Sequence, residues 1–207
     1  VLADPDSARR HGTLSNSNFI HLYNFAVVLN GRWDSQNAWK EAKKNGTEEK
    51  FISDPENRKN FMESFKSLSL EYKLSNINQA KAFGKYIEMI GCFYTDRSVD
   101  FELVTSFTSE QTLIIGRAEH RRWLQEHYDM GWTYGNPPKA LRDCLRTHFD
   151  MIPDLSYDDL NDSGWVITPE MANINYGRLG KDEQDKDTEP MECMMAMMKM
   201  FDGIRIY

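Results

Sequence analysis

Apolar residues recur at steps of three and four along several segments of this chain of 207 residues. Between residues 75 and 90 they are Ile77, Ala80, Phe83, Ile87 and Ile90, and Gly91 follows. This period places the apolar side chains on one face of an α-helix, which glycine commonly ends. Similar segments lie at 18–29, 35–44, 55–68, 108–130 and 187–201, and short apolar stretches at 92–94 and 203–207 are strand candidates. The sequence therefore predicts a mainly α fold with a few short β-strands.

Three of these segments begin with residues that favour a helix start. Ser17 is a candidate N-cap, and Asp54 precedes a proline at the first helical position. Thr108 followed three residues later by Gln111 matches a capping box. Short helices are also expected near 157–160 and 169–178, within a long polar stretch.

Two helical segments match at an offset of 111 residues. The matched pairs are Ala80 with Met191, Phe83 with Met194, Ile87 with Met198, Ile90 with Phe201, and Asn76 with Asp187 as a cap-type residue at each start. A second match has an offset of 99, where Ile20-His21 falls on Glu119-His120. Chance agreement between amphipathic helices is the alternative. A duplicated helix-loop-helix unit explains both matches and predicts a linker or tail at 1–16, a degenerate first half at 17–92 and a second half at 93–207.

Composition narrows the class of partner. The chain has 25 Lys and Arg against 32 Asp and Glu, a net charge of −7, which disfavours a general nucleic-acid binder while leaving room for a local basic patch. No apolar run reaches the roughly 20 residues of a membrane-spanning helix. Cys92, Cys144 and Cys193 are far apart and form no CxxC pair. Reduced thiols in the cytoplasm are therefore expected, and the start at Val1 suggests a piece of a longer protein.

The densest functional signal lies at the end of the segment 108–130. Trp123 is followed, after Gly131, by Trp132 and Tyr134, which point to the same side if that stretch is extended. The three rings can converge into an aromatic pocket that suits a planar ligand. Arg121, Arg122 and Arg142 are nearby cations able to meet phosphate or carboxylate groups. The alternative is that the tryptophans are core residues and the arginines are solvated.

Other chemistries have less support. His120 and His127 are seven residues apart, more than about 10 Å along a helix, which is too far for a shared zinc ion. Neither a nucleophile elbow nor a glycine-rich phosphate loop is present. An enzyme would need Glu119 and His120 to face a water-filled cleft as an acid–base pair. No metal or cofactor is expected. The methionines at 191–200 fit a buried stripe, with a partner-binding face as the alternative.

The motif Glu119-His120-x-x-Trp123, followed by Gly131-Trp132-x-Tyr134-Gly135, resembles the signature of the RyR domain, the repeat named for ryanodine receptor channels and also found in bacterial proteins. Similar motifs follow in the family's order: Arg142-Asp143, Thr147-His148, Ile152-Pro153, Tyr157-Asp158-Asp159-Leu160 and Lys186-Asp187. Phe149 stands where the family usually has proline. Asn24 stands where an aromatic residue would mirror Trp123 in the first half.

The resemblance implies a non-catalytic regulatory module built from paired helix-loop-helix halves, of bacterial type and fused to neighbouring domains of a parent chain. It also implies a small, anionic, nucleotide-like ligand. The expected binding residues are Trp123, Trp132 and Tyr134 around the ring, Arg121, Arg122 and Arg142 for charge, and His120 and His148 to orient polar atoms. No nucleic acid is expected as a partner, a membrane only through other parts of the parent protein, and a second copy is an open option. The alternative function is a protein-interaction or scaffold module without a metabolite.

Overall fold

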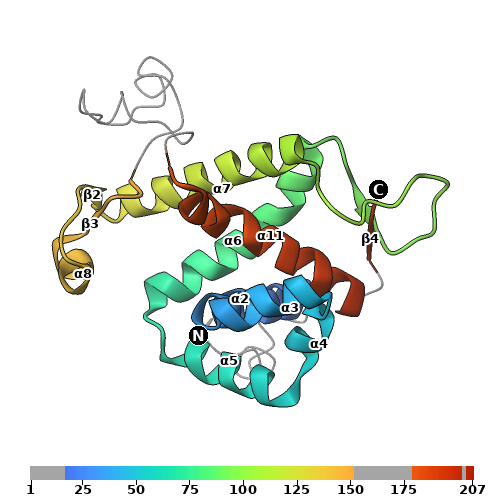
Figure 1. Cartoon of the computed structure of the whole chain (residues 1–207), viewed down its shortest axis with the longest axis horizontal. Coiled ribbons are helices and arrows are strands. Elements are labelled where there is room, and N and C mark those ends of the chain that lie inside the picture. The colour runs from blue at the N-terminus through green and yellow to red at the C-terminus, as the bar shows by residue number, and fades with distance from the viewer. Residues whose placement is uncertain (1–16, 152–178, 202–203) are drawn as a thin grey trace. The chain divides into compact units, whose positions relative to one another are not determined.

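A computed structural model describes residues 17–151, 179–201 and 204–207 (Figure 1). The fold is mainly α, as predicted. Its helices are α2 (Ser17–Asp34), α3 (Gln36–Asn45), α4 (Glu48–Ser53), α5 (Pro55–Ser67), α6 (Leu70–Met89), α7 (Ser109–Asp129), the short 3-10 helix η1 (Lys139–Leu141), α8 (Arg142–Leu145) and α11 (Lys181–Phe201). The strands are β1 (Tyr94–Thr95), β2 (Thr133–Tyr134), β3 (Thr147–His148) and β4 (Arg205–Ile206). Within these residues no helix is long and apolar enough to cross a membrane.

The chain forms two compact units. The first combines residues up to Ser106 with Pro190–Tyr207, and the second is Phe107–Glu189. Helix α11 therefore contributes its start to the second unit and its later turns to the first. The predicted halves 17–92 and 93–207 describe a repeat along the chain and stay a prediction.

The core of the first unit is built on α2. This helix packs against α5 and α6. Its Tyr23 ring meets Phe65 of α5 edge-on, with ring centroids 5.3 Å apart, and both side chains are almost fully buried. Trp39 of α3 is also buried, with its ring 5.7 Å from that of Phe51. The methionines of α11 complete this core, since Met191, Met194, Met195, Met197 and Met198 are all buried.

Two of the predicted helix starts are confirmed. The carboxylate of Asp54 accepts hydrogen bonds from the backbone N–H groups of Glu56 and Asn57, and Pro55 is the first residue of α5. The capping box of α7 is complete, with bonds of 3.2 Å from the Gln111 N–H to the Thr108 hydroxyl and 3.0 Å in return.

Two other predicted starts are wrong, because each helix begins about a turn and a half earlier than expected. Helix α6 begins at Leu70, with Ser69 as its N-cap, and α11 begins at Lys181. Asn76 and Asp187 therefore lie inside helices and cap neither. The first turns escaped notice because they carry no buried apolar stripe: Leu70 is 62% exposed, and Lys181 is exposed too. The predicted helices near 157–160 and 169–178 lie outside the described residues.

The element boundaries agree with the 111-residue offset. Shifted by this offset, the first residue of α6 falls on that of α11, and β1 falls on β4. Ala80, Phe83 and Ile87 are buried, and so are their counterparts in α11. The two equivalent strands pair antiparallel, with Tyr94 opposite Ile206 and Thr95 opposite Arg205. Strand β4 lies within the stretch expected at 203–207, and β1 begins within the stretch expected at 92–94 and extends one residue beyond it.

Candidate functional site

The candidate site is a cluster of rings in the second unit, at the end of α7. Trp123 and His127 lie one turn apart, and their rings stack with centroids 3.9 Å apart. Gly131, with φ of +81°, then reverses the chain, and the Trp132 N–H donates to the His127 carbonyl. This turn sets Trp132 edge-on to His127 at 5.1 Å and buries it. The two tryptophans predicted to converge therefore do so through a histidine between them.

A short parallel strand pair adds a second histidine to this cluster. Strand β2 pairs with β3, and Tyr134 lies opposite His148 in the register. The His148 ring lies 5.6 Å from Trp123 and 6.5 Å from Trp132. Tyr134 itself is 38% exposed, whereas Trp132 is buried, so the two residues do not share one environment. We call Trp123, His127, Trp132, His148 and Phe149 the aromatic cluster.

Two cations flank the aromatic cluster. The Arg142 guanidinium lies 4.7 Å from the centre of the Phe149 ring, and its Nη1 is 3.4 Å from Nε2 of His148. The Lys186 ammonium lies 5.5 Å from the same ring and 3.4 Å from Oδ2 of Asp150. Phe149, Asp150 and Lys186 were not predicted as site residues. Lys186 lies 36 residues beyond Asp150, and no local pattern of the sequence indicates a contact over that distance.

His148 is held in its neutral form. The Asp150 backbone N–H donates to Nδ1 of His148 at 3.0 Å, which leaves the ring proton on Nε2. Burial, followed by the positive charges of Arg142 and Lys186, lowers the pKa of His148 to about 4. Burial also lowers the pKa of His127, although its Nδ1 lies 2.9 Å from the Trp123 carbonyl oxygen. Near neutral pH the cluster therefore presents uncharged imidazoles.

The pKa of the Asp150 carboxyl group is raised, whereas the pKa values of the two histidines are lowered. Burial raises its pKa from 3.8 to about 7; the Lys186 charge opposes this, and a hydrogen bond with Glu183 adds to it. Burial alone would also raise the pKa of Glu183, but its hydrogen bonds with Lys186 and Asp150 lower it. The two carboxyls thus separate into one that keeps its proton and one that stays ionised beside the lysine.

This separation predicts a pH-dependent stability difference for Asp150→Asn. Between about pH 4 and pH 7 the folded wild type keeps a proton that the unfolded chain has lost, so its stability falls as pH rises. Asparagine does not titrate, so the variant does not lose stability in this way. The free energy of unfolding of the variant minus that of wild type should therefore rise across this pH window and level off above it. Urea denaturation at several pH values measures this, with exposed Asp129→Asn as the control. A difference independent of pH would contradict it.

Arg121 and Arg122, the two cations expected at the site from α7, lie in different environments. Arg122 bonds Glu119 through two nitrogens, at 2.8 and 2.6 Å, and its Nη1 lies 2.7 Å from Glu126. Burial opposes its charge, but the two carboxylates raise the pKa of Arg122 above its usual value. Its guanidinium is therefore committed to the protein. Arg121 is exposed on the same helix.

His120 is buried and paired within the protein. Its Nδ1 lies 3.3 Å from Oδ2 of Asp187, and its ring stacks beside Trp123 at 6.0 Å. Asp187 of α11 thus pairs with His120 of α7 instead of capping its own helix. Glu119 is only 1% exposed and bound to Arg122, so it does not face a water-filled cleft with His120 as the acid–base alternative requires. Within the described ranges no group of three His, Cys, Asp or Glu side chains is placed to hold a metal ion.

The chain matches no family model, no curated protein and no solved structure. The resemblance to the RyR domain accordingly rests on the motifs of the sequence. The structure brings together Trp123, Trp132, Arg142 and His148 from the expected set. It places Tyr134 and Arg121 at exposed positions and engages His120 and Arg122 with carboxylates.

Proposed function

We propose that this chain is a non-catalytic RyR-type regulatory module that binds a small, anionic, nucleotide-like ligand at the aromatic cluster. The observation that carries the proposal is the placement of Arg142 and Lys186 beside the Phe149 ring of the aromatic cluster, at 4.7 Å and 5.5 Å from its centre. In a chain of net charge −7, two cations gathered beside aromatic rings form a local site for an anion.

Each part of the ligand has a matching group. A planar base can stack on the half-buried faces of Trp123, His148 or Phe149, which offer π-surface without a charge. A phosphate can bind Arg142, whose guanidinium gives paired donors, and can compete with Glu183 for the ammonium of Lys186, which pairs with that carboxylate in the structure. Nε2 of neutral His148 lies 3.4 Å from Nη1 of Arg142, so the two side chains can meet the same polar group of the ligand. His120 packs beside Trp123, and Tyr134 is exposed opposite His148 in the strand register.

Titration calorimetry against adenine and guanine nucleotides, both linear and cyclic, tests this function. We expect at least one nucleotide to bind, and Arg142→Gln/Lys186→Gln to weaken that binding about tenfold or more through loss of two charge-assisted contacts. Lys139→Gln/Lys181→Gln removes the same charge from exposed positions in η1 and α11 and should bind normally. Silence across the whole panel, with folded protein, would exclude the proposal.

The second candidate is a protein-interaction module. It is favoured by exposed apolar side chains on the segment around β1 in the first unit, where Tyr94 is 47%, Phe101 68% and Leu103 49% exposed. Light scattering after gel filtration distinguishes the two functions. Self-association that Phe101→Ser abolishes, together with no nucleotide binding, would support this candidate instead.

A further inference from the structure

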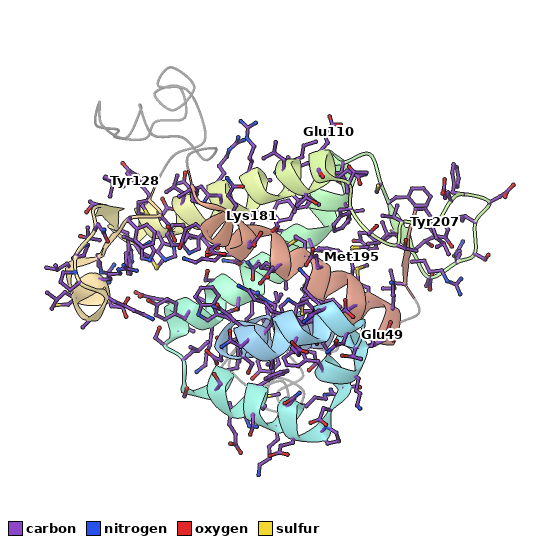
Figure 2. All side chains as sticks on the ribbon, viewed as in Figure 1. Glu49, Glu110, Tyr128, Lys181, Met195 and Tyr207 are labelled. Atoms are coloured by element: carbon purple, nitrogen blue, oxygen red, sulfur yellow. The ribbon has the colours of Figure 1, made fainter. Side chains whose placement is uncertain are left out.

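The first unit contains an apolar cavity apart from the aromatic cluster. Its volume is about 190 Å³. Three stretches of chain line it: Leu103, Val104 and Thr105 before α7, Met195, Met198 and Lys199 of α11, and Ile204, Arg205 and Ile206 around β4. Figure 2 labels Met195, one of the lining residues, on α11.

The walls of the cavity are held in place by the backbone. Strand β4 pairs with β1 on one side, and its Ile206 carbonyl accepts a 2.9 Å hydrogen bond from the Val104 N–H on the other. Met195 and Met198 are buried on the face of α11 that packs into the core of the unit. The cavity is therefore framed by paired backbone and a packed helix.

The lining combines an apolar interior with positive charge. Lys199 and Arg205 are exposed, and neither forms an ion pair with a carboxylate among the residues that the structure describes. Methionine side chains adapt readily to a flexible alkyl chain. The volume is smaller than the about 300–1,000 Å³ of drug-sized sites, which limits the ligand to a short chain.

We propose that this cavity binds a free monocarboxylate with a short alkyl chain. The alkyl chain of the ligand contacts Met195, Met198 and Ile204, and its carboxylate contacts Lys199 and Arg205. The site is independent of the nucleotide-like ligand, because all its residues belong to the first unit. The module would then bind two ligands of different chemistry, a nucleotide-like anion and an alkyl monocarboxylate.

Calorimetry with octanoate, 1-octanol and octylamine tests this proposal, because the three probes share an alkyl chain and differ in head group. Octanoate should bind with a stoichiometry of one, at least about fivefold more tightly than octanol, and octylamine more weakly still. Lys199→Gln/Arg205→Gln should abolish the preference for octanoate. The charge-matched control Lys66→Gln/Lys85→Gln, at exposed positions of α5 and α6, should retain it.

A second variant tests the place of binding. Thr105 is exposed at the cavity, so Thr105→Trp should cover it without disturbing the core and should remove octanoate binding. Equal affinity for all three probes, octanoate binding that survives Thr105→Trp, or no octanoate binding at millimolar concentration would each overturn the proposal.

Discussion

Replacing Arg122 by methionine is expected to lower the free energy of unfolding by about 3–5 kcal/mol. The Glu119 side chain is 2% exposed and receives two of the guanidinium's hydrogen bonds. Methionine keeps much of the apolar length of arginine but removes both donors. The variant therefore leaves a buried carboxylate without its counter-charge, which costs far more than the loss of a surface ion pair.

The double variant Glu119→Leu/Arg122→Met separates charge from packing. Because removing both partners leaves no buried charge, it should recover most of the lost stability. Glu126→Gln is the matched single change on the other side of Arg122; its side chain is 21% exposed, and it should cost about 1 kcal/mol or less. Urea denaturation followed by tryptophan fluorescence measures all three. If Arg122→Met were as stable as wild type, the Glu119–Arg122 pair would not stabilise this helix.

Gly31→Ala is expected to destabilise the first unit by about 3 kcal/mol. Gly31 lies within α2, where it faces the buried ring of Phe61 in α5. A Cβ atom there would overlap Cγ and Cδ1 of Phe61 and lie 2.7 Å from its Cβ. These atoms belong to the base of the side chain, so no rotamer change removes the overlap and the two helices must move apart.

Gly84→Ala provides the matched comparison. Gly84 also lies inside a helix, α6, but its added Cβ would meet the outer end of the Tyr94 ring, with the hydroxyl oxygen 3.1 Å away. Both substitutions gain about 1 kcal/mol of helix propensity, so their difference reports the close packing of α2 on α5. Gly84→Ala should stay within about 1 kcal/mol of wild type. Thermal and urea denaturation measure both, and equal stabilities would refute the close approach at Gly31.

The local sequence pattern predicted part of the aromatic cluster. Trp123 and Trp132 were predicted to converge because they flank a helix end marked by Gly131, and the αL turn there brings them to the same histidine. Tyr134 was expected on the same side as Trp132. Strand β2 has only two residues, too few to carry the alternation that this expectation used, and Tyr134 is exposed.

The sequence by itself determined the six longest helices apart from the first turns of α6 and α11, and the caps at Asp54 and Thr108, because these depend on neighbours within a turn or two of the same helix. The short helices α4 and α8 were not predicted. Only the tertiary structure decided the partners of the charged groups. Lys186 reaches Asp150 and His120 reaches Asp187 across long stretches of chain. The Arg122–Glu119 pair is local, three residues apart on α7, but its burial was decided by the tertiary structure. Burial sets these pairings, since a desolvated charge takes whichever counter-charge the fold brings within reach.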